Sequence, residues 1–141
     1  MEEVALGMFP TVFVRMTGRG GGVREFRALI DPGAEYCVIP KVDAFFLGFS
    51  EIANDDPTGQ ASNNLTFATY NGYGKAISIV MAQVELGRMS FKKVEFLALD
   101  IPQVTGFDVI LGRSLLQFMK LEFDYPRATL RIEERTGELK H

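Results

Sequence analysis

Hydrophobic segments rich in β-branched and aromatic residues recur at short intervals along the chain, separated by Gly, Asn and Pro. This arrangement is typical of β-strands joined by turns. Two further segments have the apolar spacing of short helices. The pattern predicts a mostly β protein, with strands at 11–16, 23–30, 36–39, 65–70, 74–86, 89–99, 109–111, 121–124 and 129–133, and helices at 41–47 and 113–119.

Turn residues between these segments predict hairpins and loops. The glycine-rich stretch 17–22 joins the first two strands and lacks the Gly-Lys-Ser/Thr ending of a phosphate-binding loop. Asn71-Gly72 favours a type I′ turn, because both central residues of that turn have positive φ. The segment 50–64 is rich in Asn, Asp and Gly, so we expect a surface loop there. Residues after Glu134 are polar, and we expect them to fray.

The composition is that of an ordinary globular domain. Of 141 residues, 47% are hydrophobic and 23% charged, which favours one domain spanning 1–141. The 15 Lys and Arg against 18 Asp and Glu give a net charge of -3, which offers no basic surface to nucleic acid. The N-terminus begins Met1-Glu2-Glu3, unlike a signal peptide, and no apolar run reaches about 18 residues. We therefore expect a cytoplasmic protein with no nucleic-acid or membrane partner.

The counts of reactive residue types narrow the chemistry. The sequence has one Cys, Cys37, and one His, His141 at its last position. These numbers disfavour a disulfide framework, a Cys/His zinc site and serine or cysteine catalysis through a buried His. We therefore expect no metal and no cofactor, and Cys37 is interpreted as a small buried core residue. Carboxylates remain as the available catalytic groups.

Asp31 is the carboxylate in the most informative position. It directly follows an apolar strand, and Gly33 then allows the backbone to turn sharply before a second apolar strand begins. A strand-end Asp that only serves its own turn is common. The placement alone therefore leaves a structural and a catalytic interpretation open.

Two sequence blocks favour the catalytic interpretation. The stretch Leu29-Ile30-Asp31-Pro32-Gly33-Ala34-Glu35 resembles the active-site loop of retropepsin-like aspartic proteases, which reads apolar, apolar, Asp, Thr or Ser, Gly, Ala. Ile110-Leu111-Gly112, followed by Arg113, resembles the family's apolar-apolar-Gly block before its single C-terminal helix. The hairpin Tyr70-Asn71-Gly72-Tyr73-Gly74 lies between them, where the family has its substrate-covering flap. The stretch from Leu115 to Tyr125 resembles prokaryotic and archaeal single-domain members more than viral ones.

The resemblance implies an all-β fold, a closed acid-protease β-barrel with one or two short helices. It also implies an aspartic endopeptidase acting on a peptide or protein substrate, with Asp31 catalytic. The sequence contains one Asp-X-Gly-Ala stretch, so a pair of aspartates requires a homodimer with the site on its axis. Two carboxylates roughly 3 Å apart would share one proton, so that one activates water and the other donates to the carbonyl oxygen.

The family pattern also suggests supporting roles. In retroviral relatives the acidic residue after the loop pairs with the Arg after the apolar-apolar-Gly block, which here implies that Glu35 and Arg113 brace the loop. Exposed pairs of this kind contribute only about 0 to 1 kcal/mol. Tyr70 and Tyr73 would reach the substrate from the flap.

Pro32 departs from the family pattern. Relatives have Thr or Ser there, and that residue's hydroxyl and N–H form reciprocal hydrogen bonds between the two loops of the dimer. Proline supplies neither group and fixes φ near about -65°. An alternative function is therefore a non-catalytic binding or dimerisation module of the same fold.

Overall fold

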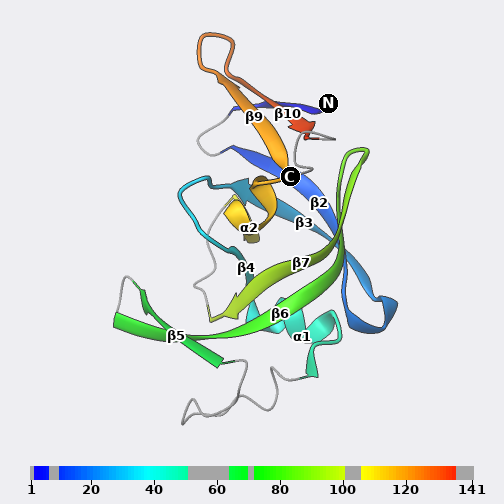
Figure 1. Cartoon of the computed structure of the whole chain (residues 1–141), viewed down its shortest axis with the longest axis vertical. Coiled ribbons are helices and arrows are strands. Elements are labelled where there is room, and N and C mark those ends of the chain that lie inside the picture. The colour runs from blue at the N-terminus through cyan, green and yellow to red at the C-terminus, as the bar shows by residue number, and fades with distance from the viewer. Residues whose placement is uncertain (1, 7–9, 51–63, 70–71, 101–105, 136–141) are drawn as a thin grey trace.

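The computed structural model describes residues 2–6, 10–50, 64–69, 72–100 and 106–135, with 64–69 and 72–75 described by their backbone alone. Strands predominate and the helices are short (Figure 1), which confirms the predicted all-β class. In chain order the elements are β1 (Glu2–Ala5), β2 (Thr11–Thr17), η1 (Arg19–Gly21), β3 (Val23–Ile30), β4 (Cys37–Pro40), α1 (Lys41–Phe46), β5 (Asn64–Thr69), β6 (Gly72–Leu86), β7 (Met89–Leu99), β8 (Val109–Leu111), α2 (Arg113–Leu116), β9 (Met119–Asp124) and β10 (Thr129–Glu134).

The main sheet closes into a barrel. Its strands follow the order β2-β3-β8-β4-β7-β6, and antiparallel pairing of β2 with β6 completes the ring. β5 continues the sheet beyond the ring as the partner of β6 in a hairpin. The closed barrel confirms the architecture that the sequence resemblance implied.

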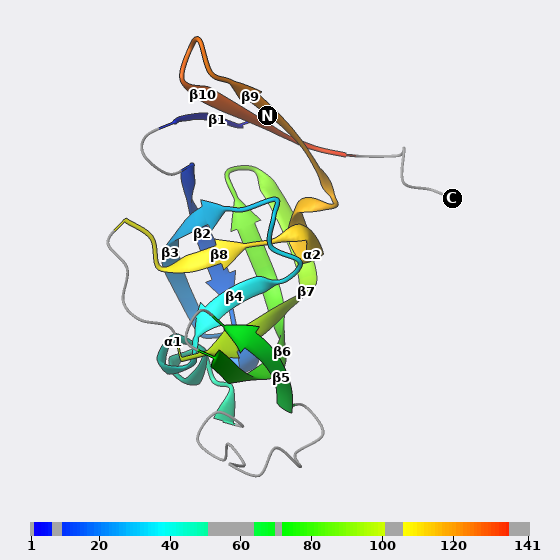
Figure 2. The same cartoon turned by 90° about the vertical axis from the view of Figure 1, so that its left-hand side faces the viewer.

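β8 lies between β3 and β4, which are consecutive in the sequence but are not neighbours in the sheet. It runs parallel to β3 and antiparallel to β4. The loop 31–36 therefore has to pass the end of β8 to connect β3 with β4. Figure 2 shows this loop beside α2, the short helix that follows β8. The topology of the sheet thus holds the loop that carries Asp31 next to the Ile110-Leu111-Gly112 block.

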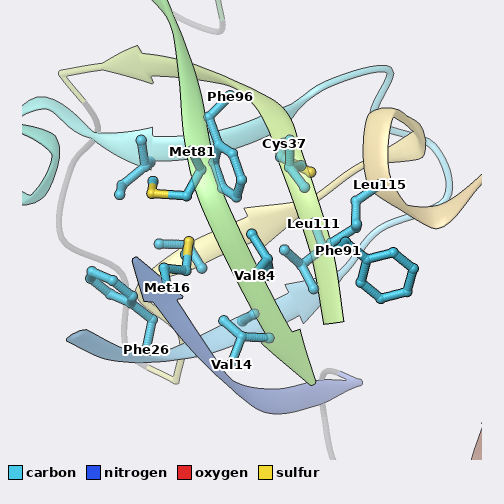
Figure 3. Close-up of a cluster of buried hydrophobic side chains, with 14 of the residues drawn as sticks. Val14, Met16, Phe26, Cys37, Met81, Val84, Phe91, Phe96, Leu111 and Leu115 are labelled. Atoms are coloured by element: carbon cyan, nitrogen blue, oxygen red, sulfur yellow. The ribbon is translucent and has the colours of Figure 1, made fainter. Parts of the chain in front are cut away.

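Alternating side chains of the barrel strands fill its interior. On β3 the inward residues Phe26, Ala28 and Ile30 are at most 4% exposed, while the residues between them are less buried. Figure 3 shows strands from all sides contributing to this cluster. The two longest strands change their buried face midway, where Lys93 of β7 has a positive φ of 56°. This change lets one bent hairpin cover two sides of the core.

A second sheet, in the order β1-β10-β9, lies beyond one end of the barrel (Figures 1 and 2). Its inner face contributes Leu130 and Ile132 to the common core, and both are fully buried. On its outer face Arg131 lies opposite acidic residues of both neighbouring strands. Glu2 Oε1 accepts a hydrogen bond of 3.3 Å from the N–H of Arg88, which ties this sheet to the turn between β6 and β7.

The structure corrects two sequence predictions. The helix expected at 113–119 ends at Leu116, because Met119 already begins β9 and pairs with Glu134. Its apolar spacing fitted a helix, but Met119 is buried as a strand residue. β1 was missed because the strand has only four residues and two of them are acidic. Most of the expected loop 50–64 and nearly all of the expected frayed tail lie outside the described residues.

Among the described residues, α1 and α2 have six and four residues, and η1 has three. None of them has the length and apolar character that a membrane-spanning helix requires.

Candidate active site

Asp31 begins the loop between β3 and β4, and its own atoms shape the turn. Its N–H donates to the carbonyl of Leu111 at 3.0 Å, which fixes the end of β3 against β8. Its Oδ1 accepts from the N–H of Gly33 at 3.0 Å, and its carbonyl accepts from the N–H of Ala34 at 3.1 Å. Asp31 as a whole residue is half-buried. The turn therefore orients one carboxylate oxygen, and Asp31 serves its own turn as strand-end aspartates commonly do.

The loop divides into two parts by its contacts. We call Asp31–Gly33 the front arm and Ala34–Cys37 the rear arm. The front arm is bound to the rest of the chain through the N–H of Asp31, and Pro32 and Gly33 are exposed. The rear arm is bound at several points to the first turn of α2. The two arms therefore depend on different surroundings.

α2 holds the rear arm through its first main-chain N–H groups. The N–H of Arg113 donates to the carbonyl of Ala34 at 2.8 Å, and the N–H of Ser114 donates to that of Glu35 at 2.9 Å. A helix begins with N–H groups that have no partner inside it, so these bonds also satisfy the start of α2. The block Ile110, Leu111 and Gly112 thus places the first turn of α2 against the Asp31 loop.

Gly112 makes this close approach possible. A Cβ at this position would lie 2.3 Å from the carbonyl oxygen of Tyr36 and 2.8 Å from that of Ala34. Both are main-chain atoms, which cannot move aside as a flexible side chain could. The glycine of the apolar-apolar-Gly block is therefore required sterically.

The expected ion pair between Glu35 and Arg113 does not form. Both side chains are exposed, and in the described part of the chain neither takes part in a salt bridge. The physical reason is that the main chain of α2 already anchors the rear arm, so the side chains extend into solvent. Arg113 does brace the loop, but through its backbone N–H.

Cys37 is the last residue of the rear arm, and its side chain lies in the core. The residue is fully buried, and its Sγ accepts a hydrogen bond of 3.4 Å from the N–H of Gly112. Figure 3 shows it beside Leu111 and Leu115. Burial raises the pKa of the Cys37 thiol above its ordinary value, although bonds from Ser114 and nearby backbone oppose the shift. The interpretation of Cys37 as a small buried core residue is confirmed.

An apolar strip lies on the outer face of the barrel next to Asp31. Leu29 pairs with Ile110, and Ile110 pairs with Val38, so the three side chains share one face of β3, β8 and β4. All three are half-buried, while their sequence neighbours in the strands point into the core. Sequence reasoning identified Ile110 only as part of a motif. Strand alternation could have identified Leu29 and Val38, because each is flanked by core residues.

The predicted flap is partly described. Gly72, Tyr73 and Gly74 begin β6 and pair with residues of β5 in an antiparallel hairpin. Tyr70 and Asn71 lie outside the described residues. The hairpin itself is therefore found where the sequence predicted it.

No cluster of metal-binding side chains occurs among the residues that the structure describes, counting groups of three or more His, Cys, Asp or Glu.

Comparisons with known proteins agree with this fold. The model of the aspartyl protease family matches residues 14–115. A retropepsin-like aspartic protease from Rickettsia conorii has a similar structure, with a TM-score of 0.59 and 21% identity over 94% of this chain and 98% of that one. The retroviral protease-like domain of Ddi1 from Leishmania major gives a TM-score of 0.57 and 17% identity, covering 88% and 87%. No curated protein sequence matches. Because the family model covers well over half of its length, the chain belongs to the aspartyl protease family.

Proposed function

We propose that the protein is an aspartic endopeptidase that works as a homodimer, with Asp31 of each copy forming the catalytic pair. The observation that carries the proposal is the state of Asp31 itself. Its backbone and Oδ1 are held by the turn, while Oδ2 has no hydrogen-bond partner within the described part of the chain. The carboxylate is thus oriented and still available to a second carboxyl group and to water.

The chemistry follows from sharing one proton between two carboxyl groups. The ionised carboxylate takes a proton from water while the water oxygen bonds to the carbonyl carbon of the peptide. The protonated partner donates its proton to the carbonyl oxygen, which gives a neutral tetrahedral intermediate. Collapse of this intermediate breaks the C–N bond: the ionised carboxylate takes a proton from one hydroxyl, and the protonated carboxyl group gives its proton to the leaving nitrogen. One copy of the chain supplies only half of this pair.

The apolar strip suggests the class of substrate. Leu29, Ile110 and Val38 are half-buried beside Asp31 in the single chain. A substrate with apolar side chains next to the cleaved bond would cover them and remove apolar surface from water. We therefore expect cleavage of unfolded segments at apolar residues.

A non-catalytic module of the same fold is the second candidate, and Pro32 favours it. Pro32 has no N–H to donate, and the front arm is exposed. A dimer that used other contacts could leave the two carboxyl groups too far apart to share a proton. The Asp31 to Asp31 distance in the dimer separates the two candidates.

The test is cleavage of an unstructured polypeptide between acidic and neutral pH. We expect the specific activity to rise with protein concentration, because each site needs two copies. Pepstatin and Asp31→Asn should both abolish cleavage. Asp100→Asn is the matched control, since the Asp100 side chain is 88% exposed and its salt bridge with Lys41 measures 3.6 Å. It should cleave as the wild type does.

Absence of cleavage over this pH range at high protein concentration would contradict the proposal. Cleavage by Asp31→Asn at the wild-type rate would contradict the catalytic role of Asp31. In the first case, a dimer with separated Asp31 residues would support the non-catalytic module.

A further inference from the structure

We propose that Ser114 is a positioning residue whose hydroxyl links the Asp31 loop to β7 and so sets the place of the Asp31 carboxyl group. This inference rests on the proposed function for its meaning in catalysis. Ser114 follows Arg113, just after the apolar-apolar-Gly block, and nothing in the sequence pattern distinguished it. Its contacts carry the argument.

Three of the hydrogen bonds of Ser114 join three different segments. Its N–H donates to the carbonyl of Glu35 at 2.9 Å. Its Oγ accepts from the N–H of Cys37 at 3.0 Å, the first residue of β4. The same Oγ donates its single proton toward the carbonyl oxygen of Glu95 on β7 at 3.1 Å, with Cys37 Sγ as a second acceptor at 3.3 Å. One residue of α2 therefore joins the loop, β4 and β7.

The hydroxyl replaces a direct bond between neighbouring strands. β4 and β7 pair in parallel, with Cys37 opposite Phe96. At the point where this pairing begins, the Ser114 hydroxyl stands between the N–H of Cys37 and the carbonyl of Glu95. It accepts from one and donates to the other, which an alkyl side chain cannot do. The hydroxyl thus determines where the rear arm leaves the sheet.

The position of the rear arm is transmitted to Asp31 along a short path. The Ala34 N–H donates to the Asp31 carbonyl at 3.1 Å, and the Ala34 carbonyl is fixed by Arg113 at 2.8 Å. Gly33, between them, donates to the Asp31 carboxylate at 3.0 Å. A displacement at Cys37 and Glu35 therefore reaches the turn that orients the carboxylate. Misplacement by about 1 Å can lower catalysis by about 100-fold.

The test compares Ser114→Thr with Ser114→Val, which have the same shape but differ in the hydroxyl. Ser114→Thr should keep kcat within about 3-fold of the wild type, and Ser114→Val should lower it by about 10- to 100-fold. KM should change little in both, because Ser114 donates and accepts within the chain and is not proposed to contact substrate. Ser90→Ala is the matched control, since Ser90 Oγ accepts from Gln83 at 2.7 Å on the hairpin of β6 and β7.

A second measurement does not depend on activity. Amide hydrogen exchange at Gly33 and Ala34 should become about 10-fold faster in Ser114→Val than in Ser114→Thr, since their N–H bonds lie in the turn that the rear arm supports. Exchange in β2 should stay unchanged. If the wild type cleaves nothing, the proposed function fails, and this exchange measurement still decides the role of Ser114.

Equal kcat and equal loop exchange in the Thr and Val variants would overturn the proposal. A Val variant that fails to fold while the Thr variant folds would also overturn it, because the hydroxyl would then serve the fold and not the place of Asp31.

Discussion

The two arms of the Asp31 loop differ in what holds them. The rear arm is bound to α2 by the Ala34 and Glu35 carbonyls and to the core by Cys37. The front arm has one main-chain bond to the rest of the chain, from Asp31 to Leu111, and is otherwise organised by its own turn. A single chain therefore completes the rear of its site and leaves the front exposed. Under the proposed function, the second copy completes the front.

The difference between the two arms also explains why the chain tolerates Pro32, which departs from the family pattern. Pro32 lies in the front arm, where it breaks no hydrogen bond within the described chain. Gly112 contacts the rear arm, where a single added methyl group would meet main-chain atoms. An added methyl group at Gly112 should thus affect folding, and substitutions in the front arm should affect association and catalysis.

Gly112→Ala is expected to have the largest effect. Its Cβ would lie 2.3 Å from the Tyr36 oxygen, so the free energy of unfolding should fall by about 3 kcal/mol through overpacking. Gly22→Ala is the control, because nothing lies within 4 Å of its Cβ and its φ of -62° suits any residue. Urea unfolding measures both. Equal stability of the two variants would show that the rear arm is not held tightly against α2.

Pro32→Thr is expected to change the front arm with a moderate effect. Threonine supplies the N–H and hydroxyl that relatives use between loops, each hydrogen bond contributing about 1 kcal/mol. The dissociation constant of the dimer, measured by sedimentation, should fall about 10-fold. The stability of the monomer should be slightly lower than that of the wild type, because proline restricts the unfolded chain. Pro32→Ala separates the two groups, since it restores the N–H alone. Unchanged association in both variants would place the dimer contact away from the front arm.

Cys37→Ala is expected to have the smallest effect, on the pH dependence of stability. Burial raises the pKa of the Cys37 thiol from its ordinary value of 9.0. The unfolded chain therefore loses this proton first, and the free energy of unfolding falls as pH rises above about 9. Below that pH the thiol adds no slope. The alanine variant should show a shallower alkaline fall, and an identical slope would mean that Cys37 is accessible to solvent.

The sequence predicted the barrel strands and the Asp31 loop because alternation and turn residues are local signals. It placed Asp31 and Gly112 correctly in two adjoining blocks, since the family pattern specifies both. It assigned the brace to the side chains of Glu35 and Arg113, whereas main-chain N–H groups provide it. A bond between backbone groups that are far apart in sequence leaves no trace in residue type. Ser114 was missed for a related reason, because its partners come together only when β4, β7 and α2 pack.

Mixed dimers test the central claim most directly, namely that one site needs Asp31 from two copies. Wild-type chains and chains carrying Asp31→Asn are co-expressed in varying proportion, and cleavage is measured at constant total protein. If both carboxyl groups act together, activity follows the square of the wild-type fraction, and an equal mixture retains about one quarter. Sedimentation checks that the variant dimerises normally. Activity proportional to the wild-type fraction, with about one half retained in the equal mixture, would contradict the account.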